Sequence, residues 1–177
     1  RAAFTASRPE PMSQRKDRIR RAIALVKDHG EEFAKAMSAD FGNRSYAQSM
    51  LTDIAATVGA GNHALKHMDA WAKPEKRKVQ FPLGLLGAKA EVRYEPKGVI
   101  GILSPWNVPV QLAFGPLMQV LAAGNRAMIK PSEFTERTSA IMGDLWNRGL
   151  TIETIIPICI VAGAVLAGVT SALSGET

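Results

Sequence analysis

Cysteine is nearly absent from this chain of 177 residues, which contains only Cys159. A single cysteine cannot form an internal disulfide or a thiolate metal cluster, so disulfide-rich scaffolds and cysteine-ligated metal modules are excluded. No cation, histidine or second cysteine lies beside Cys159 in the sequence to activate its thiol. We therefore expect a buried structural thiol at this position.

Several targeting and metal-binding signals are also missing. The chain begins at Arg1 and has no secretory apolar region near its start, so we expect a cytoplasmic fragment or trimmed product. The apolar stretch 155–169 is shorter than the roughly 20 residues that a spanning helix needs, and we expect no membrane anchor. His63 and His67 lie four residues apart without H-E-x-x-H or a third ligand, so no metal site is expected.

The composition that remains is that of an ordinary globular protein. Hydrophobic residues make up 46% and charged residues 21%, which excludes wholesale disorder and coiled coil. Lys and Arg number 22 against 16 Asp and Glu, a formal net charge of +6. The basic runs 15–21 and 73–78 contain no aromatic residues and no nucleic-acid motif, so we interpret them as solvated helix faces. Nucleic acid is not expected as a partner, and a module for anionic polymers is the weaker alternative.

Residues 1–80 read as an N-terminal helical segment. Apolar residues recur at helical spacing in three stretches, which end near Gly30, near Gly42 and before Pro74. In the third stretch, from Ser45 towards Trp71, the spacing predicts four inward-facing residues: Met50, Leu51, Ile54 and Val58. Segment 81–97 differs, because apolar and charged residues alternate over 90–95, the period of a half-buried strand.

From residue 98 the pattern changes to that of a parallel strand–helix–strand–helix unit. The apolar run 98–103 predicts a strand covered on both faces, followed by a helix over 109–123, a strand over 127–129 and a helix over 135–147. The fold class is therefore α/β, with N-terminal helices followed by part of a parallel sheet. The segments 104–107 and 130–133 follow the two strands, and such strand ends share the edge where open α/β sheets bind ligands.

Two short motifs at this edge are candidates for chemistry. The Asn107 amide can act as a preorganised donor to a developing oxyanion, or it can satisfy backbone groups in a turn. Glu133 can accept hydrogen bonds from ribose hydroxyls, and Lys130 can donate to them or pair with a 2′-phosphate. The alternative is that Ser132 or Thr135 only caps the next helix. The usual G-x-G-x-x-G fingerprint is missing between Leu103 and Pro109.

The segment E-P-K-G-V-I-G-I-L-S-P-W-N-V-P over 95–109 resembles the signature of the aldehyde dehydrogenase superfamily. The match continues through Gly115-Pro116, L-A-A-G-N over 121–125 and K-P-S-E over 130–133. Upstream, A-D-F-G-N-R-S over 39–45 is similar to the coniferyl aldehyde dehydrogenase branch. The similarity covers residues 15–143, and it implies a doubly wound, Rossmann-like sheet that is truncated in this chain.

The resemblance implies oxidation of an aldehyde, most like coniferyl or a related aromatic aldehyde, to the acid with NAD or NADP. In the family a cysteine thiolate attacks the carbonyl, hydride passes to the nicotinamide, and a glutamate-activated water hydrolyses the thioester. Asn107 matches the amide that holds the substrate oxygen. Segment 81–97 would belong to strands used for oligomerisation, so a homo-oligomer is expected for the full-length family member. The remaining matched positions are Leu103, Ser104, Pro105, Trp106, Lys130, Ser132 and Glu133 for the cofactor and Val108 and Leu112 for the substrate tunnel.

The resemblance stops in the tail. Residues 98–177 read as a partial dinucleotide-binding βαβ unit whose sequence diverges from 144, where 146–150 and 155–158 do not match the family. A frameshift, a splice or a gene truncation is the hypothesis for this tail. Cys159 stands too early to replace the family nucleophile, so the isolated chain is expected to be inactive. The alternative function is a catalytically inactive nucleotide-binding or subunit-interaction fragment.

Overall fold

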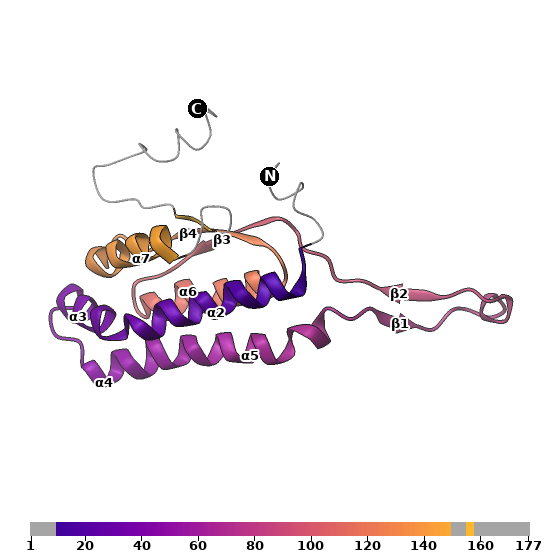
Figure 1. The fold of residues 1–177 in the computed structure, drawn as a ribbon, viewed down its shortest axis with the longest axis horizontal. Coiled ribbons are helices and arrows are strands. Elements are labelled where there is room, and N and C mark those ends of the chain that lie inside the picture. The colour runs from indigo at the N-terminus through magenta and orange to yellow at the C-terminus, as the bar shows by residue number, and fades with distance from the viewer. Residues whose placement is uncertain (1–9, 150–154, 158–177) are drawn as a thin grey trace, which may run out of the picture.

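The structure, a computed structural model, describes residues 10–149 and 155–157 (Figure 1). Four helical stretches and one π-helical turn come first, and a long two-stranded arm follows. The last described part is a three-stranded sheet with two helices. The first group comprises α2 (Met12–Asp28), α3 (Gly30–Asp40), α4 (Tyr46–Ser49), the π turn η1 (Met50–Ala55) and α5 (Ala56–Trp71). The second group comprises β3 (Val99–Leu103), α6 (Pro109–Ala122), β4 (Arg126–Lys130), α7 (Glu136–Gly149) and β5 (Ile155–Pro157).

The sheet is parallel, with the strand order β3-β4-β5. Val99 pairs with Arg126 and Leu103 with Lys130, so β3 and β4 run in step and end together. Helices α6 and α7 connect neighbouring strands in the same direction along the sheet. Right-handed crossovers of this kind place both helices on one face. The α/β fold class, with helices followed by part of a parallel sheet, is confirmed.

Strand β3 differs from the expectation of burial on both faces. Ile102 is buried in one core with Ala127 and Ile129 of β4. On the other face of β3, Val99 is 37% and Leu103 79% exposed. That prediction is wrong for the described residues, because both crossover helices cover the same face of the sheet. A continuous apolar run does not distinguish a strand covered once from a strand covered twice.

The N-terminal helices and the sheet share one hydrophobic core. Phe114 of α6 lies at its centre: its ring meets Phe33 of α3 edge-on, with centroids 6.3 Å apart, and Trp146 of α7 at 5.6 Å. All three side chains are buried. Aromatic pairs in such tilted arrangements stabilise the core beyond the area they bury. The helical segment is thus packed against the unit that carries the candidate site.

The turn between α6 and β4 is built by Gly124 and Asn125. Gly124 has φ +75°, a left-handed backbone conformation that favours glycine. The Asn125 side chain accepts a hydrogen bond from the Gly98 N–H at 2.8 Å. This bond ties the start of β3 to the start of β4. The L-A-A-G-N motif therefore sets the register of the two strands.

The predicted third helix is interrupted by the π turn η1. A π turn contains one more residue per turn than an α-helix and rotates the residues on either side relative to each other. Leu51 is consequently 70% exposed, so its predicted inward orientation is wrong, while Ile54 is buried as predicted. The same rotation buries the polar side chains of Ser49 and Asp53 completely.

The arm extends away from the helical body (Figure 1). It consists of β1 (Glu75–Arg77), the 3₁₀ turn η2 (Leu83–Leu86) and β2 (Ala90–Val92), with β1 and β2 antiparallel. The predicted strand is present at 90–92, but both strands are exposed on all their residues, so half-burial is wrong. Alternation along β2 reflects cross-strand pairing in a ribbon rather than one covered face.

Candidate active site at the carboxyl edge of the sheet

Strands β3 and β4 end at the same edge, which we call the carboxyl edge. Leu103 pairs with Lys130, and the Ser104 N–H donates to the Lys130 carbonyl at 3.0 Å. The loops 104–108 and 131–135 therefore begin side by side. The sequence prediction that these two segments share one rim agrees with this register, because parallel neighbours without a stagger must end together.

The loop 104–108 presents a mixed apolar and amide surface. Leu103 is 79% and Trp106 52% exposed, and Pro105 and Asn107 are exposed as well. Ser104 differs: its side chain is buried and its hydroxyl donates to the Pro109 carbonyl at 3.1 Å. Ser104 thus fastens the loop to the start of α6, and the exposed side chains beside it are the ones available to a ligand.

Arg44, in the connection between α3 and α4, holds this loop. Its Nη1 donates to the Asn107 carbonyl at 2.7 Å, and its Nη2 donates to Asp53 Oδ2 at 2.7 Å and to Thr52 Oγ1 at 3.0 Å. The guanidinium lies over the Phe41 ring, 4.9 Å from its centroid. The Phe41 ring in turn packs 6.1 Å from Trp106. Arginine suits this place because its planar fork offers several donors at fixed angles.

Asp53 receives donors from two directions. Its Oδ1 accepts from the N–H groups of Val110 at 3.0 Å and Gln111 at 3.3 Å, in the first turn of α6. Burial raises the pKa of Asp53 above its ordinary value of 3.8, and Arg44 and the two N–H groups oppose this shift. Every donor around it stabilises the carboxylate form. Asp53 therefore caps α6 from a distant part of the chain.

Asp40 does the same for α7. Its carboxylate accepts from the N–H groups of Arg137 at 3.1 Å and Thr138 at 2.9 Å, and from the Thr138 hydroxyl at 2.7 Å. The first N–H groups of a helix are the usual seat of a cofactor phosphate in doubly wound folds. At both α6 and α7 these groups already bond a carboxylate. A diphosphate at either helix start would have to displace that carboxylate.

Lys130 and Glu133 form an exposed ion pair beyond the end of β4. Lys130 Nζ lies 2.6 Å from Glu133 Oε2, with the Glu133 side chain 51% exposed. The hydrogen bond from Lys130 is the largest cause that lowers the pKa of Glu133 below its ordinary value of 4.5. A solvent-facing carboxylate beside a cation can accept hydrogen bonds from a pair of adjacent hydroxyl groups.

The other predicted positions lie around this edge and differ in burial and in hydrogen bonding. Ser132 is buried, and its Oγ accepts from the Phe134 N–H at 3.2 Å within the turn. Thr135 donates from its hydroxyl to the Ser132 carbonyl at 3.4 Å. The turn is thus internally bonded, and Asp40, rather than Ser132 or Thr135, bonds the first amides of α7. Val108 and Leu112 are half-buried at the start of α6.

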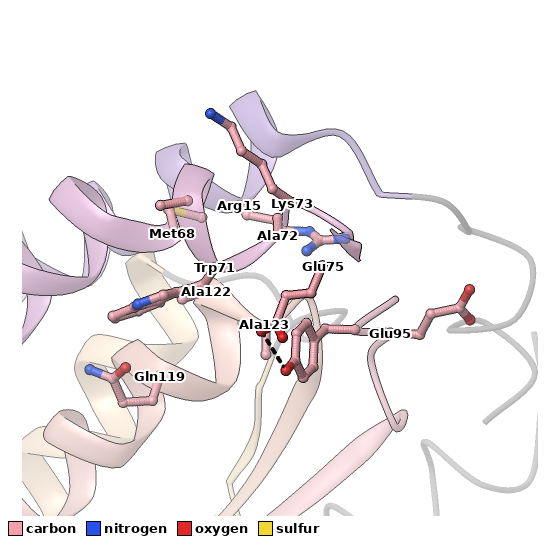
Figure 2. Close-up of a pocket in the computed structure, with 12 residues that line it drawn as sticks. Arg15, Met68, Trp71, Ala72, Lys73, Glu75, Glu95, Gln119, Ala122 and Ala123 are labelled. Atoms are coloured by element: carbon pink, nitrogen blue, oxygen red, sulfur yellow. Dashed lines mark hydrogen bonds between the residues drawn. The ribbon is translucent and has the colours of Figure 1, made fainter. Parts of the chain in front are cut away.

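A pocket of about 570 Å³ lies elsewhere, between the end of α5, the base of the arm and the end of α6 (Figure 2). Met68, Trp71 and Ala122 form part of its apolar lining, and Tyr94 donates to Glu75 at 2.8 Å beside it. Helix α6 begins at Pro109, two residues after Asn107, and ends at Ala122. The pocket is therefore at the opposite end of that helix from the carboxyl edge.

The histidine pair for which no metal site is expected lies on α5, with His63 exposed and His67 half-buried. The rings of His63 and His67 are 4.4 Å apart and pack with Trp71. Among the described residues, no group of three or more His, Cys, Asp or Glu side chains has the arrangement of a metal site. The described helices also include none whose length and apolar character would let it span a bilayer. Cys159 lies outside the described residues.

Sequence reasoning missed Arg44, Asp53 and Asp40. Arg44 and Asp40 belong to the A-D-F-G-N-R-S segment, whose family resemblance indicates no role for either residue. Asp53 stands directly before the inward-facing Ile54 in an apolar helical pattern, and a carboxylate in such a place signals a buried partner. That signal was available, but nothing in the local pattern names the partner.

Comparison with known proteins places this arrangement in a family. The profile described as "Aldehyde dehydrogenase family" matches residues 1–160. A probable coniferyl aldehyde dehydrogenase of Caulobacter vibrioides is 46% identical over 155 residues, covering 87% of this chain and 32% of the relative. A coniferyl aldehyde dehydrogenase of Pseudomonas sp. HR199 is 49% identical over 140 residues, covering 79% of this chain and 28% of the relative.

A solved structure of Staphylococcus aureus AldH in a substrate-bound state has a TM-score of 0.81 and 30% identity, over 89% of this chain and 34% of that chain. This likeness supports a Rossmann-like sheet. The chain spans about a third of the length of the relatives it matches. A family profile that covers most of the chain, together with a common fold, is sufficient for assignment, and the chain belongs to the aldehyde dehydrogenase family.

Proposed function

We propose that this chain provides the oxyanion-binding amide and the ribose-binding end of a cofactor site for NAD(P)-dependent oxidation of an aldehyde. The preferred substrate class is coniferyl or a related aromatic aldehyde, as in the names of the two relatives at 46% and 49% identity. The observation that carries the proposal is the pairing of Leu103 with Lys130. This register brings Asn107 and the Lys130–Glu133 pair to one edge of the sheet.

The residues at the carboxyl edge fit the adenosine ribose of NAD(P). Glu133 offers an exposed carboxylate whose pKa is lowered by Lys130, so it accepts hydrogen bonds at neutral pH. Leu103 and Trp106 offer apolar surface beside it. Bound NAD(P) would supply the hydride acceptor for the oxidation. We propose Leu103, Ser104, Pro105, Trp106, Lys130, Ser132 and Glu133 as the cofactor-facing set, with Ser104 and Ser132 shaping the two turns.

Asn107 is the proposed catalytic residue of this chain. When a nucleophile adds to an aldehyde, negative charge develops on the carbonyl oxygen, and a preorganised N–H donor stabilises it. Asn107 is exposed, and among the described residues no partner occupies its side-chain amide. Val108 and Leu112 would border the substrate on its apolar side. Removing such a donor costs on the order of 10²–10³ in turnover in other enzymes.

Turnover also needs a nucleophile, and the only cysteine in the sequence is Cys159. Covalent catalysis in this family uses a thiolate, and Cys159 has no activating neighbour in the sequence. We propose that the 177-residue chain alone does not oxidise aldehydes. The test mixes purified chain, NAD or NADP, and coniferyl aldehyde, and follows absorbance of the reduced nicotinamide. Steady production of reduced cofactor would contradict this part of the proposal.

The role of Asn107 is tested in a chimera. Residues 10–149 of this chain replace the matching segment of the Caulobacter vibrioides relative, and coniferyl aldehyde oxidation is measured. The wild-type chimera should turn over, and Asn107→Ala should lower kcat by about 10²–10³. The control is Asn62→Ala, which changes an exposed asparagine on α5. An inactive chimera, or an active Asn107→Ala variant, would overturn the proposal.

Cofactor binding is tested separately on the chain by calorimetry with NAD and with NADP. Glu133→Ala should weaken binding of both, because both carry the adenosine ribose 3′-hydroxyl. Lys130→Ala should weaken NADP more than NAD if Lys130 pairs with the 2′-phosphate. Glu136→Ala, at an exposed glutamate in the first turn of α7, is the control. Equal binding by wild type and Glu133→Ala would remove Glu133 from the site.

The second candidate is a catalytically inactive nucleotide-binding or subunit-interaction fragment. The arm favours it, because Phe81, Leu85 and Leu86 at its tip are 79–80% exposed. Exposed apolar side chains gathered at one place mark interaction surfaces. A homo-oligomer formed through the arm is therefore part of the proposal. Nucleotide binding and self-association without turnover, in chain and chimera alike, would favour this candidate.

A further inference from the structure

We propose that Arg44 and Asp53 are positioning residues that hold the backbone of Asn107, and with it the side-chain amide, at the carboxyl edge. The inference deepens the proposed function and rests on it, because it explains how the Asn107 amide is held where the proposed function needs it. Whether the loop is held by this pair is a separate question that the chain alone can answer.

The loop has few attachments of its own. Trp106 and Asn107 are exposed, and the Ser104 hydroxyl bonds only within the loop and helix start, to Pro109. The Asn107 carbonyl is held by one side-chain donor, Arg44 Nη1, at 2.7 Å. Exposed backbone with few buried contacts opens locally at low cost in free energy. A charge-assisted hydrogen bond from a buried guanidinium counters that opening.

The carboxylate of Asp53 is bonded to groups on both sides of the Asn107 side chain. One oxygen bonds Arg44, which holds the Asn107 carbonyl, and the other bonds the Val110 N–H three residues further on. The loop end and the helix start are therefore fixed to the same buried group. The Phe41 ring adds a third attachment, since it lies under the Arg44 guanidinium and against Trp106.

Stability alone does not account for this pair. The Arg44 side chain is 6% and the Asp53 side chain 0% exposed. Burying two charges carries a desolvation cost that the ion pair often only balances, so a buried pair is a weak source of stability. Its distinctive effect here is geometric, because the fork of Arg44 sets the distance between the Asn107 carbonyl and Asp53. A lysine has one nitrogen and cannot span both acceptors in the same way.

The first experiment uses the full chain labelled with 5-fluorotryptophan and observed by ¹⁹F NMR. The sequence contains three tryptophans, and the Trp106 resonance is assigned with Trp106→Phe. Arg44→Lys and Arg44→Met should shift or broaden the Trp106 resonance, while the resonance of buried Trp146 stays in place and shows that the core is folded. Asp53→Asn keeps an oxygen for the Val110 N–H but loses the charge that orients Arg44, so it should move Trp106 as well.

Arg18→Lys is the matched control. Arg18 is a second buried arginine, in α2, and it forms an ion pair with Glu10. It should change the free energy of unfolding without moving Trp106. An unchanged Trp106 resonance in Arg44→Lys and Arg44→Met would overturn the inference. An equal shift in Arg18→Lys would also overturn it, because the effect would then be general destabilisation.

The second experiment measures kinetics in the chimera. Misplacing a catalytic group by about 1 Å can cost 10²-fold in rate. Arg44→Lys should therefore lower kcat and kcat/KM together by up to about 10²-fold, and Arg18→Lys should not. Wild-type kcat in Arg44→Lys would overturn the positioning role while leaving the proposed function intact. If the wild-type chimera is inactive, the proposed function fails, and the ¹⁹F result still decides whether the pair holds the loop.

Discussion

Three carboxylates near the candidate site face different surroundings, and their residue-scale chemistry differs accordingly. Asp53 is fully buried, and burial raises its pKa despite the guanidinium beside it. Asp40 lies at the end of α3 and bonds backbone N–H groups. Glu133 is exposed and pairs with Lys130, which lowers its pKa. The same functional group therefore serves as a buried anchor, as a helix cap and as an exposed partner of a lysine.

We predict that Lys130→Met raises the pKa of Glu133 towards 4.5, because the hydrogen bond from Lys130 is the main cause of its depression. A carboxylate with a lowered folded-state pKa stabilises the fold above the unfolded value. That contribution is lost as pH falls below about 4.5 through the folded pKa. Carbon-detected NMR titration of the glutamates measures the shift, with Lys66→Met as the control. An unmoved Glu133 titration would contradict the ion pair.

At the scale of elements, the first N–H groups of both crossover helices, α6 and α7, donate to carboxylates supplied by the N-terminal helical segment. Asp53 in the π turn η1 bonds the first turn of α6, and Asp40 at the end of α3 bonds the first turn of α7. Caps of this kind satisfy N–H groups that a helix cannot satisfy itself. They also orient the helix starts that flank the two loops of the candidate site.

Asp40→Ala should lower the free energy of unfolding by about 1–2 kcal/mol, the usual range for loss of a helix cap. It removes the acceptor for the Arg137 and Thr138 N–H groups. Asp69→Ala removes an exposed aspartate that pairs with Lys16, and it should change stability by about 0.5 kcal/mol or less. Urea unfolding compares the two. Equal losses would mean that Asp40 is not a cap.

Two glycines of α5, Gly59 and Gly61, should respond oppositely to alanine. A Cβ at exposed Gly59 meets nothing within 4 Å, so Gly59→Ala should stabilise by up to about 1 kcal/mol through helix propensity. A Cβ at buried Gly61 would lie 2.6 Å from Ile23 Cγ1 of α2. Overpacking of this kind costs about 1–3 kcal/mol. Thermal and urea unfolding of both variants measure the change in the free energy of unfolding. Stabilisation by Gly61→Ala would show that Ile23 of α2 moves aside at little cost.

At the scale of the whole molecule, one compact body carries a long exposed arm. The core joins α2, α3 and α5 to α6, α7 and the sheet around Phe114. The arm has only short exposed strands, and its tip presents large apolar side chains to solvent. A two-stranded ribbon with such a tip is marginal alone and gains stability by packing against another surface.

We predict that the chain self-associates through the arm tip. Replacing Phe81, Leu85 and Leu86 together by serine should reduce association, measured by analytical ultracentrifugation over a range of concentrations. The free energy of unfolding of the body should stay the same, since these residues are 79–80% exposed. Leu51→Ser, at a 70% exposed leucine on the body, is the control. Unchanged association in the triple variant would exclude the tip as the contact.

The positions of most elements followed from local pattern. Helical spacing placed α2, α3 and α6, and the proline and polar residues that follow each strand placed the two loops of the carboxyl edge. The π turn was missed, because a one-residue insertion changes which side chains face inward without changing composition. Leu51 was assigned inward for that reason. Exposure of one face of β3 was missed because covering depends on which helices lie above it.

Local sequence was sufficient for the α/β class, the strand–helix–strand order and the candidate residues Asn107, Lys130 and Glu133, because periodicity and strand-end chemistry are short-range properties. Only the tertiary structure paired Arg44 with Asn107 across 63 residues, Asp53 with Val110 across 57, and Asp40 with Arg137 across 97. Each pair joins a buried or half-buried charge to a backbone group. Local sequence does not indicate which helix start or loop supplies that backbone group, because the partner is determined by how the helices pack against the sheet.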